Sequence, residues 1–200
     1  MEVPTVYIER EPLLNILMAA AEVYNRECLG YIFGRKPTKR QNRFVVTSAI
    51  TCAAVVRRTN AHVRQSERAF RRMNELMQAE PASFPWLGDF HSHPSRPYRL
   101  ACDLSAEDLN NMVTDDYRFG ILVSISRRGK RPLEWRLKSR RTRLRGTLGK
   151  FDFHLVAHQL IRDAAGTAIR DEHGKPKARR LAIEVASQTL KSLNRSARLM

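Results

Sequence analysis

Hydrophobic and polar residues follow helical spacing in four stretches of the chain. These stretches are EPLLNILMAAAEVYN (11–25), SERAFRRMNELMQAE (66–80), SAEDLNNMVTDD (105–116) and RRLAIEVASQTLKSLN (179–194). In the long stretches the apolar residues recur at a spacing that places them on one face of a helix. Pro12 suits a first helical turn, and Pro81 ends the second helix. The pattern therefore predicts four helices, the last of them near the C-terminus.

Shorter apolar runs, rich in residues that favour strands, lie between these helices. They cover 5–9, 27–35, 43–56, 86–94, 119–128, 132–138 and 149–161, and 43–56 is long enough for one or two strands. In 119–128 the apolar residues alternate with other residues, which is the strand period. The order of helices and strands predicts a mixed α/β fold with a largely antiparallel sheet.

The size of the chain suits one domain, or one domain with a tail. It has 200 residues, and its 42% of hydrophobic residues are enough for a sizeable core. We expect a domain over residues 1–160 and a basic C-terminal extension with a helix over 161–200. A glycine-rich turn region, Gly166 to Pro176, precedes that helix, so the extension is expected to be loosely attached.

The charge balance is strongly positive. Lys and Arg number 36 and Asp and Glu number 20, which gives a net charge of +16. Three groups of basic residues stand out, namely Arg35, Lys36, Lys39, Arg40 and Arg43; Lys138, Arg140, Arg141, Arg143 and Arg145; and Lys175, Lys177, Arg179 and Arg180. Such a surface attracts polyanions or acidic proteins, and a solvated basic surface that only keeps the protein soluble is the alternative.

Cysteines and terminal residues indicate the compartment. Cys28, Cys52 and Cys102 are too few and too scattered for a disulfide framework, which favours a reducing environment. The first residues contain acids and a proline where a signal peptide needs a basic start and an apolar run. No apolar stretch approaches the ~20 residues that cross a bilayer. We expect a cytoplasmic protein with no membrane partner.

Two histidines one residue apart are the first candidates for chemistry. His91 and His93 lie in WLGDFHSHP, and side chains alternate along a strand, so both imidazoles face the same side while Ser92 faces the other. Neutral imidazole nitrogens are natural zinc ligands. A pair of half-buried polar side chains without a metal is the alternative.

A carboxylate downstream adds to the histidine pair. Ser105 precedes Asp108 by three residues at the start of a predicted helix, which is the spacing of a helix-capping arrangement. The two interpretations are compatible, because a rigid cap fixes the first turn and would aim Asp108 at the histidines. Two histidines and one carboxylate leave a fourth zinc position for water, as in catalytic sites.

A general base for that water is expected from the segment NRECLGYIFG. Glu27 opens a predicted strand beside an apolar stretch, where partial desolvation would raise the pKa of its carboxyl and suit it to act as a base. The alternative is a glutamate at a helix end that faces solvent.

Taken together, these pieces resemble the JAMM motif of MPN-domain metalloproteases. The matching elements are Glu27 with Gly30 and Gly34, then His91, Ser92, His93 and Pro94, then Ser105 and Asp108. The resemblance covers roughly residues 4 to 160. The motif is fairly specific, because it requires two separated pieces of sequence in a fixed order.

The resemblance implies an MPN fold, a cytidine-deaminase-like mixed sheet between helices. It implies zinc held by His91, His93 and Asp108, Glu27 as the proton carrier and Ser105 as the group that stabilises the oxyanion. Members of the family cleave peptide or isopeptide bonds after ubiquitin-like modifiers, and others act on sulfur-carrier proteins or small peptides.

The sequence departs from this family in the connection between Pro94 and Ser105. Ten residues separate them, more than the family usually has, and Leu104 stands where a proline is often found. The longer loop either contacts substrate or spoils the ligand geometry. In the second case Asp103 is a fallback carboxylate, and Cys102 is a candidate inhibitory fourth ligand, with an inert thiol as the default.

The remaining histidines are expected to have no catalytic role. His154 and His158 would lie about 13 Å apart on a strand, too far to share an ion, so we expect them at the surface. His62 and His173 have no companions in the sequence. Two other functions remain open: a RadC-like protein that binds nucleic acid through its arginines, and an MPN scaffold without activity.

Overall fold

The computed structural model describes residues 3–60, 62–83, 85–95 and 102–198. Its helices are α1 (Arg10–Glu22), α2 (Glu67–Ala79), α3 (Ala106–Thr114) and α4 (Ser187–Arg198). Its strands are β1 (Thr5–Ile8), β2 (Leu29–Arg35), β3 (Arg43–Thr51), β4 (Val55–Arg58), β5 (Val63–Gln65), β6 (Trp86–Pro94), β7 (Gly120–Arg127), β8 (Arg136–Lys138), β9 (Arg143–Leu148), β10 (Phe151–Leu160), β11 (Ala178–Leu181) and β12 (Ile183–Val185). The predicted mixed α/β fold is confirmed.

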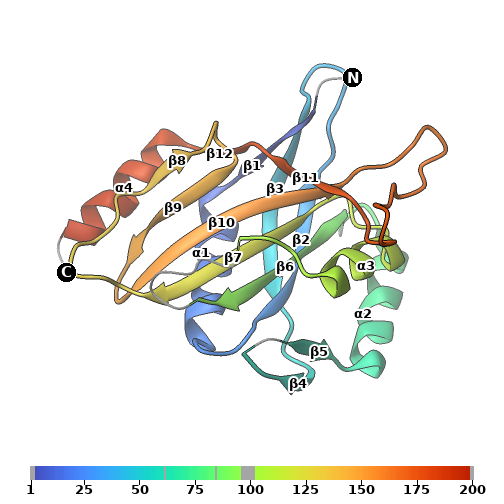
Figure 1. The fold of residues 1–200 in the computed structure, drawn as a ribbon, viewed down its shortest axis with the longest axis horizontal. Helices are drawn as coiled ribbons and strands as arrows, with labels where there is room; N and C mark the ends of the chain where they lie inside the picture. Colours follow the sequence, from blue (N-terminus) through green and yellow to red (C-terminus); the bar gives the residue numbers. More distant parts are fainter. Residues whose placement is uncertain (1–2, 61, 84, 96–101, 199–200) are drawn as a thin grey trace.

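One large mixed sheet organises the molecule (Figure 1). Its strand order is β12-β1-β3-β2-β6-β7-β10-β9-β8, and β11 pairs with the end of β10. The pairs β12–β1, β1–β3 and β6–β7 are parallel, and the others are antiparallel. Because β6 and β7 are parallel neighbours, α3 returns the chain between them, and the end of β6 comes close to the start of α3.

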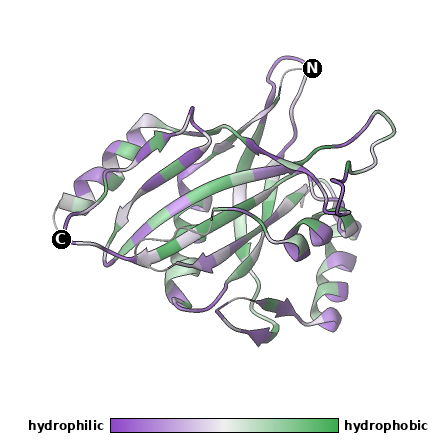
Figure 2. Cartoon of the chain, viewed as in Figure 1, coloured by the Kyte–Doolittle hydropathy of each residue, from purple (hydrophilic) through white to green (hydrophobic). Residues whose placement is uncertain are grey.

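Helices cover both faces of this sheet. Leu13 of α1 and Leu193 of α4 belong to the main core on one face. On the other face, Leu109 of α3 packs with Leu122 of β7, and Met77 of α2 packs with Tyr31 of β2. Figure 2 shows α2 and α4 striped in hydrophobic and hydrophilic colours, as expected for helices that bury one side. Among the described residues, no helix is long and apolar enough to cross a membrane.

The C-terminal segment is part of this sheet and core. Strand β12 pairs with β1, and β11 pairs with β10. The side chain of Asn194 accepts a hydrogen bond from the backbone N–H of Trp135 at 2.6 Å. The expectation of a loosely attached extension is therefore wrong, and the predicted helix over 179–194 begins only at Ser187. The boundary at residue 160 stays a prediction.

Two further features of the sheet go beyond what the sequence predicted. Strand β9 lies in a stretch that the sequence marked only as a basic cluster, because Arg143 and Arg145 alternate with Leu144. Strand β7, which was predicted from its alternating apolar residues, is buried on both faces, since it is central in the sheet and covered on each side. Both differences come from long-range pairing that the local pattern does not contain.

Candidate metal centre

His91 and His93 lie side by side at the end of β6, which runs between β2 and β7. Their ring centroids are 5.0 Å apart, because residues two apart on a strand share a face. Ser92 points to the opposite face, where its hydroxyl accepts a hydrogen bond from the backbone N–H of Cys28 at 2.9 Å. The predicted strand and the predicted directions of all three side chains are confirmed.

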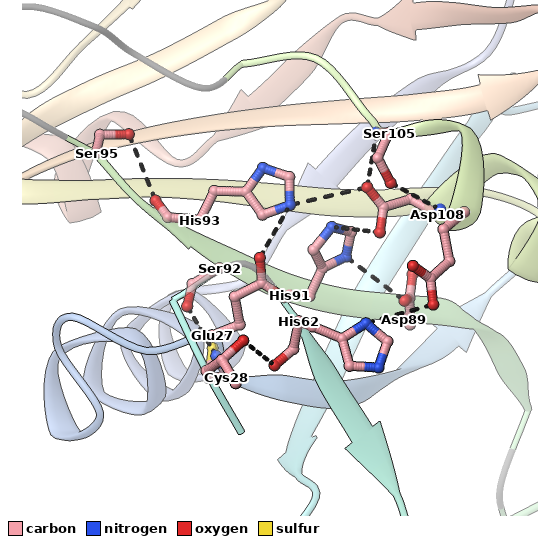
Figure 3. A network of polar contacts seen from close by, with 12 residues as sticks. Glu27, Cys28, His62, Asp89, His91, Ser92, His93, Ser95, Ser105 and Asp108 are labelled. Carbon is pink, nitrogen blue, oxygen red and sulfur yellow. Dashed lines mark hydrogen bonds and ion pairs between the residues drawn. The ribbon is translucent and has the colours of Figure 1, made fainter. Parts of the chain in front are cut away.

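Asp108 reaches both histidines from the first turn of α3 (Figure 3). Its Oδ1 lies 3.5 Å from Nε2 of His91, and its Oδ2 lies 3.8 Å from Nε2 of His93. A capping box with Ser105 fixes this turn: the Ser105 N–H donates to Oδ2 of Asp108 at 2.7 Å, and the Asp108 N–H donates to the Ser105 hydroxyl at 3.1 Å. The cap and the approach to the histidines therefore occur together.

These three side chains fit a metal ion. One ligand atom from each of His91, His93 and Asp108 lies within 4.8 Å of the others. Nε2 of His91 is buried, and its contact with Oδ1 of Asp108 at 3.5 Å is too long for a good hydrogen bond, so a cation between the two atoms would satisfy both. Nδ1 of the same ring lies 3.7 Å from Oδ2 of Asp89, the kind of carboxylate contact that orients a metal-binding histidine.

Glu27 approaches the same point from the segment between α1 and β2. Its Oε1 lies 3.7 Å from Nε2 of His93, and the residue is 6% exposed. The Glu27 N–H donates to the carbonyl of Thr59 at 2.8 Å, and the bond from Cys28 to Ser92 holds the next residue against β6. The alternative of a solvent-facing glutamate is therefore wrong.

Gly30 allows β2 to lie close to the histidine strand. A Cβ at this position would lie 2.2 Å from Cε1 of Phe90, the residue that precedes His91. Any larger residue would push the Phe90 ring away and disturb the strand that carries both imidazoles. This close approach gives a physical reason for glycine at this point of the motif.

The four ionisable groups of the metal-free site differ in the direction in which their pKa values are shifted. Burial raises the pKa of Glu27 to about 7, and the charges of Asp108 and Glu107 add to the rise while His91 opposes it. Burial works against the charged form of His91, but contacts with Asp108 and Asp89 raise its pKa to about 10. Burial and the charge of His91 lower the pKa of His93 to about 4. Burial also opposes the charge of Asp108, but His91 and Ser105 together hold its pKa well below the usual range.

A cavity of about 690 Å³ contains the whole constellation. Glu27, His91, His93, Ser105 and Asp108 all line it. The hairpin of β4 and β5 forms one wall and adds His62, whose Nδ1 lies 3.4 Å from Oε1 of Glu107 on α3. No pattern in the sequence indicates that contact, because the hairpin meets α3 only through the fold.

The long connection after Pro94 does not move Asp108 away from the histidines. Residues 96–101 of this connection lie outside the described residues. The fallback carboxylate of Asp103 points elsewhere and binds Arg180 at 2.5 Å. The thiol of Cys102 lies 3.9 Å from the hydroxyl of Ser124, and it is absent from the metal-compatible group among the described residues.

The expectation of surface positions for His154 and His158 is wrong. Each is only 5% exposed, because β10 lies inside the sheet with strands on both sides. Burial and neighbouring arginines lower the pKa of each to about 4. His173, by contrast, is exposed beside Glu172.

Comparisons with known proteins place this geometry in a family. Residues 10–138, more than half of the chain, match the model of the prokaryotic homologs of the JAB domain. No curated protein matches. Similar solved structures include the solution structure of protein DSY2949 from Desulfitobacterium hafniense, which is 15% identical, with 90% of this chain and 92% of that chain covered and a TM-score of 0.47. The fold is the JAB/MPN fold, and this protein belongs to the family of prokaryotic homologs of the JAB domain.

Proposed function

We propose that this protein is a zinc-dependent hydrolase of peptide or isopeptide bonds that removes a ubiquitin-like or sulfur-carrier modifier. The observation that carries the proposal is the convergence of His91, His93 and Asp108 in one cavity, with Oε1 of Glu27 3.7 Å from Nε2 of His93. Two nitrogens and one carboxylate oxygen are a donor set that zinc uses in catalytic sites. Zinc bound there would lower the pKa of water from 15.7 towards ~7 and polarise a carbonyl oxygen.

Glu27 has the properties of the proton carrier. Its pKa of about 7 means that the carboxylate takes up a proton readily near neutral pH and also releases it. Its backbone is fixed by hydrogen bonds on both sides, so Oε1 stays beside the histidines. In the proposed reaction this oxygen accepts a proton from the attacking water and later delivers it to the leaving amine.

Ser105 has a hydroxyl hydrogen to offer to the substrate. Its Oγ accepts the N–H of Asp108, which leaves the O–H to donate towards the cavity that the residue lines. Because the capping box holds the backbone of Ser105, this donor is preorganised. In the proposed reaction it stabilises the negative charge that develops on the carbonyl oxygen.

A basic strip on the same face of the sheet supports an acidic protein partner. The strip consists of Arg136, Lys138, Arg143 and Arg145 on β8 and β9. Pairing places Arg136 beside Arg145 and Lys138 beside Arg143, so all four side chains leave the same face. An acidic modifier docked on this strip would associate faster at low ionic strength. The RadC-like alternative uses the same charges for phosphates, and nucleic-acid binding without hydrolysis would favour it.

One row of paired residues connects the strip to the metal centre. From His93 the row passes through Ser124, His154, Arg145 and Arg136. Four strand spacings of ~4.8 Å separate its ends, about 19 Å in all. An extended tail of about six residues would cover that distance. The straight-line distance between the strip and the metal centre is therefore within the reach of a short C-terminal tail, while Ser124 and His154 of the row are themselves buried.

The test combines metal analysis with cleavage assays on the full chain. We expect about one zinc per chain after purification and cleavage of at least one ubiquitin-like fusion from a panel. Glu27→Gln should keep the metal and lose about 10²–10⁴-fold in turnover, as expected for a lost general base. Glu22→Gln, at the exposed end of α1, is the matched control and should keep full activity. Zinc-free protein, or activity that resists chelators, would contradict the proposal.

A further inference from the structure

The cavity continues beyond the metal centre into a region walled by aromatic rings. We name this region the aromatic lobe; it is lined by Tyr31, Phe70, Asp89, Asp115 and Tyr117. Tyr31 on β2 pairs directly with Asp89 on β6, two residues before His91. Because Asp89 and His91 share a face of β6, the lobe adjoins the metal centre along the strand.

The rings of the lobe form a connected cluster around Trp86. The centroid of Trp86 lies 5.2 Å from that of Tyr117 and 5.9 Å from that of Tyr31. Tyr31 and Phe70 are stacked with centroids 6.4 Å apart. Packing of this kind holds the rings in place before any ligand arrives. Their faces provide the negative potential that attracts a cation.

Two carboxylates in the lobe have no Lys or Arg partner within the described part of the chain. Oδ2 of Asp89 faces Nδ1 of His91 at 3.7 Å, and Asp89 is only 9% exposed. Gly120 leaves the space for this carboxylate, since a Cβ there would lie 2.9 Å from Oδ1 of Asp89. Asp115 shares a hydrogen bond with Tyr117. Asp89 is therefore paired with the His91 imidazole and Asp115 with the Tyr117 hydroxyl, and no Lys or Arg of the described residues neutralises either carboxylate.

This acidity stands out in a chain with 36 Lys and Arg against 20 Asp and Glu. Two neighbouring carboxylates do bind arginines: Glu67 binds Arg64 at 3.2 Å, and Asp116 binds Arg162 at 2.9 Å. Arg64 also lines the cavity, but Glu67 already occupies its guanidinium. In such a basic protein, two carboxylates that have no Lys or Arg partner among the described residues, set within a wall of rings, favour a cation from outside.

We propose that the aromatic lobe binds a cationic side chain, the ammonium of lysine or the guanidinium of arginine, next to the bond that is hydrolysed. The inference rests on the proposed hydrolysis and specifies its substrate. The rings of Tyr31, Phe70 and Tyr117 enclose the aliphatic stem, and Asp89 and Asp115 receive the charge. The volume of about 690 Å³ accommodates both this side chain and the reacting bond.

A binding experiment tests the lobe without any cleavage. The probes are N-acetyl-lysine methylamide and its neutral counterpart N-acetyl-norleucine methylamide, titrated into the full-length protein with and without zinc and followed by calorimetry. We expect the lysine probe to bind at least about tenfold more tightly, in the range that cation–π and carboxylate contacts supply. Equal affinity for the two probes, or binding of neither, would overturn the proposal.

Two variants test whether the tighter binding of the lysine probe comes from the lobe. Asp115→Asn should reduce the affinity for the lysine probe about tenfold and leave that for the norleucine probe unchanged. Asp116→Asn, its exposed neighbour, is the matched control and should change neither affinity. Phe70→Leu is a second variant, which keeps both carboxylates, and it too should reduce the affinity for the lysine probe. A lysine affinity that is the same in Asp115→Asn and Phe70→Leu as in the wild type would refute the assignment.

Cleavage assays separate this inference from the proposed function. Peptides that carry lysine, arginine, norleucine or glutamate beside the scissile bond are compared by kcat/KM. Cleavage without preference for the cationic peptides would refute the proposal that the lobe binds a cationic side chain, and the proposed hydrolase activity would stand. Selective binding of the lysine probe, with no cleavage of any peptide or fusion, would refute the proposed hydrolase activity. The proposal that the lobe binds a cationic side chain would then stand. A free amine that binds as tightly as the lysine probe would show that the lobe accepts a small cation instead of a peptide side chain.

Discussion

Two pairs of histidines lie on the same face of the sheet and have different surroundings. His91 and His93 end β6, and His154 and His158 lie along β10, one strand beyond β7. The register links the pairs, because Ser124 on β7 lies between His93 and His154. His91, His154 and His158 are each 5% exposed. Burial is therefore not what distinguishes a metal centre from a structural pair.

Spacing is the first difference between the pairs. Residues two apart on a strand put the rings of His91 and His93 5.0 Å apart, which is close enough to share an ion. Residues four apart, such as His154 and His158, are separated by about 13 Å along a strand. The number of residues between two histidines on one face of a strand thus decides whether their rings lie close enough to share an ion.

The sign of the neighbouring charges is the second difference. Asp108 and Asp89 surround His91 and raise its pKa to about 10 against the effect of burial. Arg143 and Arg145 lie near His154, and Arg180 lies near His158, so burial and positive charge both lower the pKa of each to about 4. Carboxylates therefore hold His91 in its charged form in the metal-free protein, whereas His154 and His158 are kept neutral. His93, with a pKa of about 4, is neutral as well, and it lies beside Asp108.

Removing one histidine from each pair tests the comparison most strongly. His93→Gln should lower zinc affinity by more than the ~10–100-fold that loss of an outer contact costs, because it removes a ligand itself. Turnover should disappear with the metal. Zinc affinity is measured by competition with a chromophoric chelator.

The control for that variant is His158→Gln, which changes the same residue type on the same face. It should bind one zinc with wild-type affinity, since this ring lies outside the metal-compatible group of the described residues. Equal loss of zinc in the two variants would contradict the separation of the pairs.

Acid should destabilise the protein through the second pair. The unfolded chain protonates histidine near pH 6.5, whereas His154 and His158 in the folded protein resist protonation down to about pH 4. The free energy of unfolding therefore falls as the pH drops from 6.5 to 4, by about 3 kcal/mol for each histidine. His91 in the metal-free protein has the opposite sign: its contribution is complete below pH 6.5 and is lost as the pH rises through about 10.

Urea denaturation of the metal-free protein at pH 7 and pH 4.5 measures this difference. The variants His154→Gln and His158→Gln should each lose less stability than the wild type between the two values. Comparison with the wild type cancels the contributions of Glu27 and His93, which titrate in the same range. Identical pH dependence in all three proteins would show that these rings are not kept neutral by the fold.

The fold was predictable from sequence where the local pattern agrees with the tertiary structure. Strand β6 was predicted at its observed bounds, and α1, α2 and α3 were predicted within a few residues. The stretch 179–185 was misread as helix, because its apolar residues fit both the helical and the strand period. This stretch forms strands because it pairs with β10 and β1, and that pairing joins residues far apart in the sequence.

The site was predictable because its spacing is local and its pieces are few. Two residues on one strand and a cap three residues from its carboxylate fix the directions of His91, His93 and Asp108. The contact of His62 with Glu107, and the acidic and aromatic lining of the lobe, depend on how α2 and the β4–β5 hairpin pack against the sheet. No short pattern in the sequence contains that information.

The residue between the histidines provides a smaller test. Ser92→Ala leaves the backbone N–H of Cys28 buried without its acceptor, and this should cost about 1–3 kcal/mol of unfolding free energy. The same bond holds the segment of Glu27 against β6, so turnover should also fall while zinc remains bound. Ser126→Ala, a buried serine of β7 that does not line the cavity, is the control. A Ser92→Ala protein with wild-type stability and turnover would remove this bond from the description of the site.

The smallest expected effect concerns the charge beside His154. Arg145 pairs directly with this histidine across β9 and β10, and its positive charge lowers the histidine pKa after burial and Arg143. Arg145→Gln should therefore raise the pKa of His154 by less than ~1 unit, because burial, the larger cause, remains. Histidine ring signals followed by NMR between pH 3 and pH 8 measure the shift. His158, whose positive neighbour is Arg180, serves as the internal control and should titrate as in the wild type. If His154 titrates at the same pH in both proteins, burial alone keeps the second pair neutral, and the sign of the neighbouring charges would matter only for the pair that faces carboxylates.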